Sequence, residues 1–281
     1  MIKIAIDAMG SDLGSRVVVK AVQQFLKDFQ DVAFVVCGNQ AELSELEGLC
    51  EIVHADEVMG MEDGALEVLR RKNTSMAKAI DLVAKQQCAG VTSAGSTGAF
   101  LTLATIRLKL IENVLRAALV SPFPTEDGRA VTILDIGANN ENTPEHLVQF
   151  ARIGSIFTQA TRQVSQPSIY LLSNGAEAKK GSPVGKQAYE LLSNQTIVDF
   201  KGNIEARDVL TGKADVVVCE GYPGNIFLKG AEGVAAMMNS LIKKAFSKNL
   251  KTKLGYLLAK KGFADMKETM NYKKYGGAML L

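Results

Sequence analysis

Residues that commonly hold metal ions are scarce in this 281-residue sequence, which has four cysteines and two histidines. The cysteines stand at positions 37, 50, 88 and 219, and no two of them form a CxxC pair. Neither His54 nor His146 has a ligand spacing with a cysteine. A metal site is therefore not expected. Unpaired thiols of this kind are typical of reduced, cytosolic proteins.

Long apolar runs are also missing. No stretch approaches the roughly 18–20 apolar residues that a membrane-spanning helix needs. The N-terminus, MIKIAIDAMGSD, lacks the basic start and long apolar core of a signal peptide. With 47% hydrophobic and 22% charged residues, the composition is that of an ordinary globular protein, which we expect in the cytoplasm. The net charge of +2 gives no general basic balance, so no nucleic-acid partner is expected.

Positive charge is concentrated near the C-terminus. From Lys243 to Lys274 there are ten lysines and two acids, Asp265 and Glu268, interspersed with Leu, Phe, Tyr and Met. This pattern predicts an amphipathic helical segment at about residues 240–274. Three interpretations stay open: a surface for anionic lipid, a docking surface for an acidic protein, and a solvated helix face with a buried apolar side.

One unit recurs along the chain: a β-branched run, a loop of small polar residues, and a helical period. It occurs, for example, at IKIAID, AVTILD, SIYLLS and ADVVVC. Thr143 and Ser182 are predicted N-caps because a proline follows each, and the last helix is predicted to begin near Asn225. The alternation predicts an α/β fold, a mainly parallel sheet with helices on both faces, in a single domain of residues 1–281. A β-hairpin is predicted at AALVSPFPTEDGRAVTILD.

The loops that follow the strands are the predicted site. Ligands of parallel α/β sheets bind beyond the carboxyl ends of the strands, where helix N-termini attract anions. TSAGSTGA, at 92–99, contains only small side chains between an apolar run and a helical pattern, so it is either a tight turn or a wall of an anion site. Neither a P-loop, nor GxGxxG after a strand, nor GxSxG is present, so no nucleotide and no protein nucleophile is indicated. The carboxylates Asp7, Asp135 and Glu220 follow strands and are candidates for either chemistry or loop structure.

Seven motifs occur in the order found in a known family. They are IDAMGSD, TSAGSTGA, DIGANNENTPEHLVQFA, LLSNGAEAKKG, KGNIEARD, DVVVCEGYPGN and YGGAMLL. Together they resemble the phosphate acyltransferases of bacterial phospholipid synthesis, called PlsX, from Ile2 to Leu281. Members of this family usually continue with another strand and a helix. The resemblance implies a fold similar to that of phosphotransacetylase and isocitrate dehydrogenase.

The resemblance also implies an activity and partners. Members of the family transfer a fatty acyl group from acyl carrier protein to inorganic phosphate, without a cofactor, and form acyl phosphate. It implies a homodimer bound peripherally to the inner face of the membrane, where a glycerol-3-phosphate acyltransferase takes the product. Two alternatives remain: a phosphotransacetylase-like acyl-CoA:phosphate transferase, and a non-catalytic membrane-associated scaffold of lipid synthesis.

The expected roles follow from the chemistry of phosphate attack on a thioester. Asp7, Asp135 and Lys180 are the catalytic candidates, the two acids by orienting donors or taking a proton. The predicted substrate-binding residues are Ser93, Gly95, Thr97, Gly98, Asn139, Asn174, Asn203 and Asn225. The sequence departs from the family pattern at Ser11, Ser96, Ala206 and Glu220, where glycine, asparagine, glycine and aspartate are usual. These departures weaken an exact transfer of roles to Ser96 and Glu220.

Overall fold

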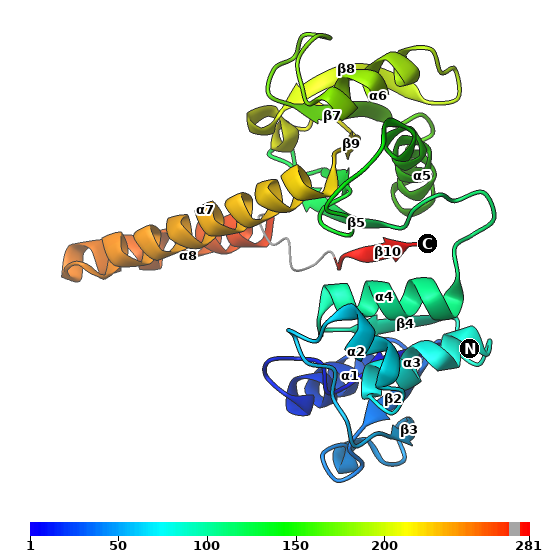
Figure 1. Ribbon diagram of the computed structural model, residues 1–281. Helices are drawn as coiled ribbons and strands as arrows, with labels where there is room; N and C mark the ends of the chain where they lie inside the picture. The colour runs from blue at the N-terminus through cyan, green and yellow to red at the C-terminus, as the bar shows by residue number, and fades with distance from the viewer. Residues whose placement is uncertain (270–275) are drawn as a thin grey trace. The chain divides into compact units, whose positions relative to one another are not determined.

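The structure is a computed structural model that describes residues 1–269 and 276–281. The chain divides into two compact units, Met1–Val114 and Leu115–Leu280. Each unit has its own sheet, a four-stranded sheet with the order β3-β2-β1-β4 and a six-stranded sheet with the order β10-β5-β6-β9-β7-β8 (Figure 1). The predicted loops therefore belong to two sheets rather than to the one sheet that the sequence analysis expects. One catalytic domain over residues 1–281 stays a prediction.

Unit 1 is a parallel α/β sheet. Its elements are β1 (Ile2–Asp7), α1 (Ser15–Asp28), β2 (Val32–Gly38), η1 (Ser44–Leu46), β3 (Glu51–His54), α2 (Ala65–Arg70), α3 (Ser75–Ala84), β4 (Gly90–Ser93) and α4 (Thr97–Leu108). All its strand pairs are parallel. The alternation of side chains along β1 covers both faces: Ile6 packs with α1, whereas Ala5 packs with α3.

Unit 2 contains the predicted hairpin and a larger sheet. Its elements are β5 (Ala118–Pro124), β6 (Ala130–Leu134), α5 (Pro144–Arg162), β7 (Ser168–Ser173), α6 (Pro183–Ser193), β8 (Asp199–Glu205), η2 (Ala206–Thr211), β9 (Val216–Val218), α7 (Gly221–Ser247), α8 (Leu250–Thr269) and β10 (Ala278–Leu280). β5 pairs antiparallel with β6 and with β10, and the other pairs are parallel. The hairpin is therefore confirmed, as are helices on both faces of a mainly parallel sheet.

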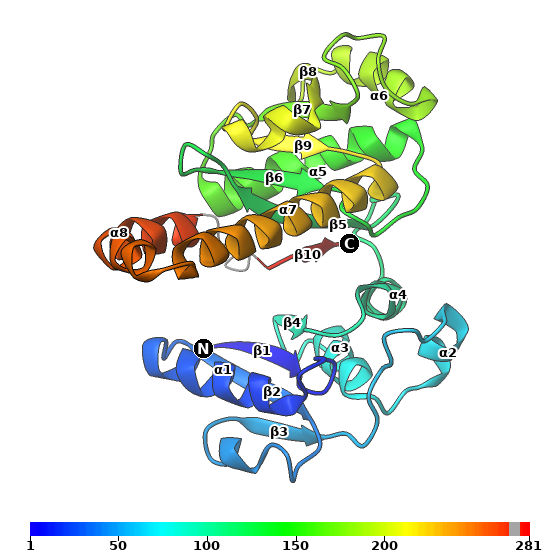
Figure 2. The same cartoon turned by 90° about the vertical axis from the view of Figure 1, so that its left-hand side faces the viewer.

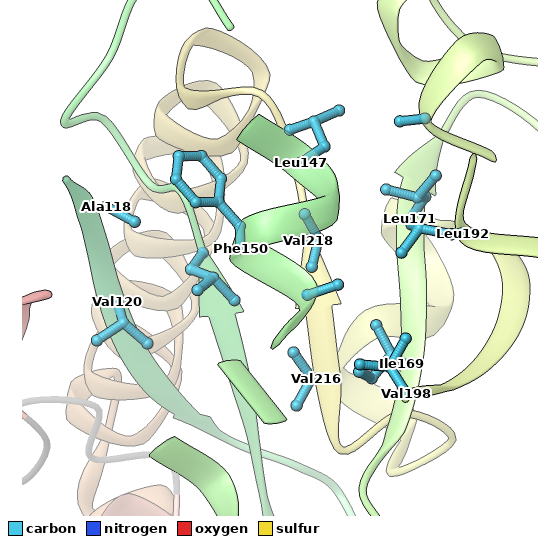
Figure 3. Packing of buried hydrophobic residues seen from close by; sticks show 13 residues of the cluster. Ala118, Val120, Leu147, Phe150, Ile169, Leu171, Leu192, Val198, Val216 and Val218 are labelled. Atoms are coloured by element: carbon cyan, nitrogen blue, oxygen red, sulfur yellow. The ribbon is translucent and has the colours of Figure 1, made fainter. Parts of the chain in front are cut away.

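A large buried cluster fixes the sheet of unit 2. Phe150 of α5 is fully buried against Val120 of β5 and Val218 of β9, and Leu192 of α6 closes the cluster (Figure 3). A second cluster lies on the opposite face, where Val209 of η2 packs with the sheet. Apolar side chains thus fill both faces of β6, β7 and β9, which places the carboxyl ends of these strands at a rigid edge.

The structure agrees with the two predicted N-caps but not with the predicted start of the last long helix. The Thr143 and Ser182 side chains accept N–H groups of His146 and Gly185, and each cap precedes a proline. The third helix, α7, begins at Gly221 rather than near Asn225. Pro223 lies in its first turn, where the backbone N–H has no intrahelical partner, so the proline does not interrupt the helix.

The lysine-rich segment forms a helical hairpin in which α8 folds back along α7 (Figure 2). Residues 270–274 of the predicted segment lie outside the described residues. None of the helices described is long and apolar enough to cross a membrane.

Candidate active site

Asp7 is the centre of the polar cluster in unit 1. Its buried carboxylate accepts the hydroxyls of Ser75 and Ser93, each at 2.6 Å, and the N–H of Met9 at 3.2 Å. The Ser93 hydroxyl in turn accepts the N–H of Gly95 at 3.0 Å. The carboxylate therefore connects β1, α3 and the end of β4. This geometry suits orientation of the serine hydroxyls better than proton transfer, because both carboxylate oxygens already accept hydrogen bonds.

Glycine allows the two loops of unit 1 to approach closely. A side chain at Gly10 would lie 2.5 Å from Asp7 Oδ2 and 2.9 Å from the Cα of Gly95. Thr97 and Gly98 lie exposed in the first turn of α4, and the Ser96 side chain caps this helix by accepting the N–H of Ala99. The family departure at Ser96 thus keeps a polar cap. A helix N-terminus with small exposed residues is suited to bind an anion.

Asp135 is the corresponding centre in unit 2. It is fully buried, and Oδ1 accepts the N–H groups of Leu119, Gly137 and Ala138 at 3.1, 3.1 and 2.8 Å. Oδ2 accepts two bonds from Asn139, from its backbone N–H at 2.9 Å and from Nδ2 at 2.7 Å. The carboxylate therefore organises the loop after β6, and no lone pair is left for a substrate proton.

Asn139 links this carboxylate to a cation. Its Nδ2 also donates to the carbonyl of Ala117 at 2.8 Å, and its Oδ1 accepts Arg116 Nε at 2.6 Å. Arg116 is exposed, so its guanidinium is held beside the loop at the surface. The sequence did not indicate Arg116, since an arginine before a predicted strand carries no motif of its own.

The helix α7 approaches the Asp135 loop through glycines. A Cβ at Gly221 would overlap the carbonyl of Asn139, and one at Gly224 would overlap the carbonyl of Asp135. Gly137 has a φ of 127°, which favours glycine, and the Asn225 side chain lies directly against it. Asn225 is thus placed at the Asp135 loop, although it lies inside the helix rather than before it.

The remaining predicted residues surround the loop after β7. Asn174 Oδ1 accepts the N–H of Gly181 at 2.9 Å, which closes the loop on itself. Asn203, which lies within β8 rather than in a loop, donates to the carbonyl of Glu177 at 2.8 Å. Lys180 is exposed at the end of this loop, and its Nζ has no ion-pair partner in the part of the chain that the structure describes. The loop therefore presents a cation from a fixed backbone.

Glu220 and Ser182 connect two helix starts of unit 2. Glu220 is the N-cap residue of α7, and its Oε1 accepts the hydroxyl of Ser182 at 2.5 Å. The buried Asn142 accepts the N–H of Gly221 at 3.0 Å, while its Nδ2 has no hydrogen-bond partner among the residues that the structure describes. Unsatisfied buried donors are rare and commonly mark functional positions. Sequence reasoning missed Asn142 and Ser75, although Asn142 lies in a polar stretch before α5 and Ser75 is the first residue of α3.

His146 has a structural role at the start of α5. Its Nδ1 accepts the N–H of Thr143 at 3.1 Å, and its own N–H donates to the Thr143 hydroxyl at 3.4 Å, which forms a capping box. Partial burial lowers the pKa of His146 below its ordinary value of 6.5, and the positive charge of Arg116 adds to this. The neutral ring is therefore the form that caps the helix.

Because the folded pKa of His146 is lowered, its contribution to stability should be fully present above the ordinary pKa and lost as the pH falls. His146→Gln keeps a cap acceptor that does not titrate. We expect wild type to lose about 0.5–1 kcal/mol more stability than this variant between about pH 7.5 and about pH 5. Urea unfolding at both pH values measures the difference, and parallel pH profiles would contradict the capping role.

Comparison with known proteins agrees with this architecture. A family model described as fatty acid synthesis protein matches residues 2–281. A phosphate acyltransferase of Lactococcus lactis subsp. cremoris is 42% identical over 98% of this chain and 85% of its own length. One from Streptococcus pneumoniae is 41% identical over 100% of this chain and 86% of its own.

Solved structures show the same fold. A phosphotransacetylase from Streptococcus pyogenes has a TM-score of 0.60 at 19% identity and covers 84% of this chain and 82% of its own. The EutD phosphotransacetylase from Staphylococcus aureus has a TM-score of 0.58 at 20% identity, with the same coverage. At this identity the likeness concerns the fold alone. From its sequence over nearly its whole length, the chain belongs to the fatty acid synthesis protein family, which includes the phosphate acyltransferases.

Proposed function

We propose that this protein is a phosphate acyltransferase that transfers a fatty acyl group from acyl carrier protein to inorganic phosphate, forming acyl phosphate for phospholipid synthesis. The observation that carries the proposal is the 41–42% identity, over at least 98% of the chain, to proteins named phosphate acyltransferase. The reaction also suits the residues, because it requires anion binding and positioned donors rather than a protein nucleophile.

The chemistry places modest demands on the protein. Phosphoryl groups lose their second proton at near-neutral pH, so a substantial fraction of inorganic phosphate is the dianion, which can act as the nucleophile. The thiol that leaves has a pKa of about 8.5 and departs with little assistance. What remains is to position the reactants and to stabilise the oxyanion that forms when phosphate attacks the thioester carbonyl. Hydroxyls, backbone N–H groups and a lysine can provide this.

The residue roles are part of the proposal. Ser93, Gly95, Thr97 and Gly98 bind either the attacking phosphate or the oxyanion. Lys180 supplies positive charge, with Asn139, Asn174, Asn203 and Asn225 as further polar groups. Asp7 and Asp135 act by orienting donors, which their hydrogen bonds support.

Phosphate-dependent release of the carrier thiol, with acyl phosphate trapped by hydroxylamine, tests the reaction directly. Acyl carrier protein should be a better donor than acyl-CoA. The reverse preference would favour the alternative of a phosphotransacetylase-like enzyme, which the fold of the solved phosphotransacetylases also accommodates. Thiol release that does not depend on phosphate, or no release at all, would overturn the enzyme proposal and leave the scaffold.

A homodimer is supported by the outer face of α7. Ile226, Val234 and Leu241 lie on one helical stripe and are each more than half exposed. Beside them a groove of about 570 Å³ extends to Phe123 and Leu210. An apolar surface of this kind on one helix is typical of an interface between subunits. We take its occupant to be a second copy of the chain, since a two-fold contact buries the same stripe on both copies.

Val234→Glu should therefore weaken the dimer at least about tenfold, because it places a charge inside the contact. Ala236→Glu is the matched control, since this exposed residue lies on the other side of α7. Light scattering after size-exclusion chromatography measures the mass across a range of concentrations. Equal behaviour of the two variants, or a monomeric wild type, would contradict the interface.

The basic helical hairpin supports peripheral binding to the cytoplasmic face of the membrane. Leu250 and Leu258 of α8 are 85% and 82% exposed, beside several lysines. Exposed leucines with lysines suit an anionic lipid surface, near which the downstream glycerol-3-phosphate acyltransferase would receive the product. Docking of the acidic carrier protein and a merely solvated face are the competing interpretations. Flotation with vesicles, with and without anionic lipid, tests the membrane interpretation, and a shift in KM for the carrier protein after charge reversal tests docking of the carrier.

A further inference from the structure

The inner side of the α7–α8 hairpin holds a cluster of three aromatic rings. The ring centroids of Phe246 and Phe263 are 4.9 Å apart, and Tyr256 lies 5.6 and 5.5 Å from these two rings. These distances are those of favourable aromatic pairs. No residue of α8 is buried, however, and Tyr256 is 40% exposed. The hairpin therefore has a small apolar core that is left open.

A cavity of about 590 Å³ lies against these rings. Ile242 and Met266 extend its apolar lining, and both come from the facing sides of the two helices. The volume is within the range of small-molecule sites. Aromatic rings and a methionine can adapt to a flexible alkyl chain, because the thioether side chain fills irregular spaces.

Apart from the neutral Asn239 and Ser247, the rest of the lining is cationic. Lys243, Lys253 and Lys267 line the same cavity, and none of them forms an ion pair within residues 1–269 and 276–281. The part of the hairpin from Lys243 to Thr269 contains two acids, Asp265 and Glu268. Neither of them lines the cavity. Lysine stems cover apolar surface while the ammonium groups stay in water, so we expect the charges at the mouth of the cavity and the rings on its floor. An apolar floor with a cationic mouth is complementary to an anionic amphiphile.

We propose that this cavity binds a single-chain anionic amphiphile and that its occupant is the acyl phosphate product. The identification of the occupant rests on the proposed function. An acyl phosphate has one alkyl chain for the apolar lining and a phosphate head for the three lysines. A long chain is unfavourable in water. A site that retains the acyl phosphate after the reaction would keep its alkyl chain out of water until the acyl group is transferred to the next acceptor.

Dodecyl phosphate is a suitable probe, since its phosphate ester is stable to water where the mixed anhydride of an acyl phosphate is not. Calorimetric titration of the whole protein, below the aggregation concentration of the probe, should show saturable binding. Decyl phosphate should bind about tenfold more weakly, because two fewer methylenes are buried. Dodecyltrimethylammonium, with the same chain and the opposite charge, should bind at least about tenfold more weakly.

Two double variants with the same change in charge locate the site. Lys253→Glu with Lys267→Glu should weaken dodecyl phosphate binding at least about tenfold. Lys260→Glu with Lys261→Glu, on the same helix but away from the cavity, should change it less than about twofold. Circular dichroism checks that both variants keep their helices. Equal losses in the two variants would show attraction to the basic surface in general and would overturn the proposal.

Two further outcomes are decisive. If vesicles of diacyl phosphatidylglycerol bind through Lys253 and Lys267 while dodecyl phosphate does not bind, the cavity belongs to membrane lipid and the inference fails. Phosphate-dependent thiol release is measured separately on wild type. Turnover without dodecyl phosphate binding removes this inference alone, whereas binding without turnover removes the proposed reaction and leaves an amphiphile site.

Discussion

Replacing Lys180 by alanine should lower kcat for phosphate-dependent thioester cleavage by about 10²–10³-fold, the usual cost of losing one positioned group that stabilises an oxyanion. The Lys180 side chain is exposed, and its loop is held by the bonds from Gly181 to Asn174 and from Asn203 to Glu177. The variant should therefore keep its thermal midpoint. The loss should appear in kcat more than in KM if Lys180 acts on the charge that develops in the transition state.

Lys179→Ala is the matched control. This variant also removes one positive charge, one position earlier in the same exposed loop. It therefore tests whether activity depends on the position of the Lys180 charge or only on the total charge of the loop. We expect less than about a threefold change in kcat for this variant. If Lys180→Ala keeps wild-type kcat, or if both variants lose activity equally, Lys180 is not the positioned cation. Thr97→Val, at the start of α4, then tests the anion site of unit 1 independently.

Gly224→Ala should destabilise the protein by about 3 kcal/mol or more, the largest stability effect that we expect. The added Cβ would overlap the carbonyl of Asp135 and would also lie 2.7 Å from Cys219 Sγ. Asp135 cannot move freely, because its carboxylate accepts the N–H groups of Gly137 and Ala138. The helix start and the Asp135 loop would have to separate, so activity should fall together with stability.

Gly233→Ala is the opposite case in the same helix. Within the described part of the chain, a Cβ at Gly233 meets nothing within 4 Å, so alanine adds helix propensity without a clash. This variant should gain up to about 1 kcal/mol. Urea unfolding of both variants gives the comparison. A Gly224→Ala protein as stable as wild type would show that α7 does not approach the Asp135 loop as closely as the structure indicates.

Local sequence chemistry determined the elements and the family. Thr143 and Ser182 cap helices as their spacing predicts, because a side-chain oxygen before a proline satisfies N–H groups that the helix leaves free. The β-branched runs form the central strands, and the hairpin at β5 and β6 follows from its turn residues. The predicted start of α7 near Asn225 was wrong. Gly221, Pro223 and Gly224 have the composition of a loop, but proline is tolerated in the first turn of a helix.

Only the tertiary structure decided which strands pair and which groups the carboxylates of Asp7 and Asp135 bind. A run such as VAFVVC is compatible with a buried strand in either sheet. The sequence therefore could not show that the first four strands form one sheet and the other six form a second. Asp7 and Asp135 follow strands in the same way in sequence, yet Asp7 binds two serine hydroxyls and Asp135 binds mainly backbone N–H groups. Their partners come from segments distant in sequence, such as Ser75 and Leu119, and only folding brings such groups to within hydrogen-bond distance.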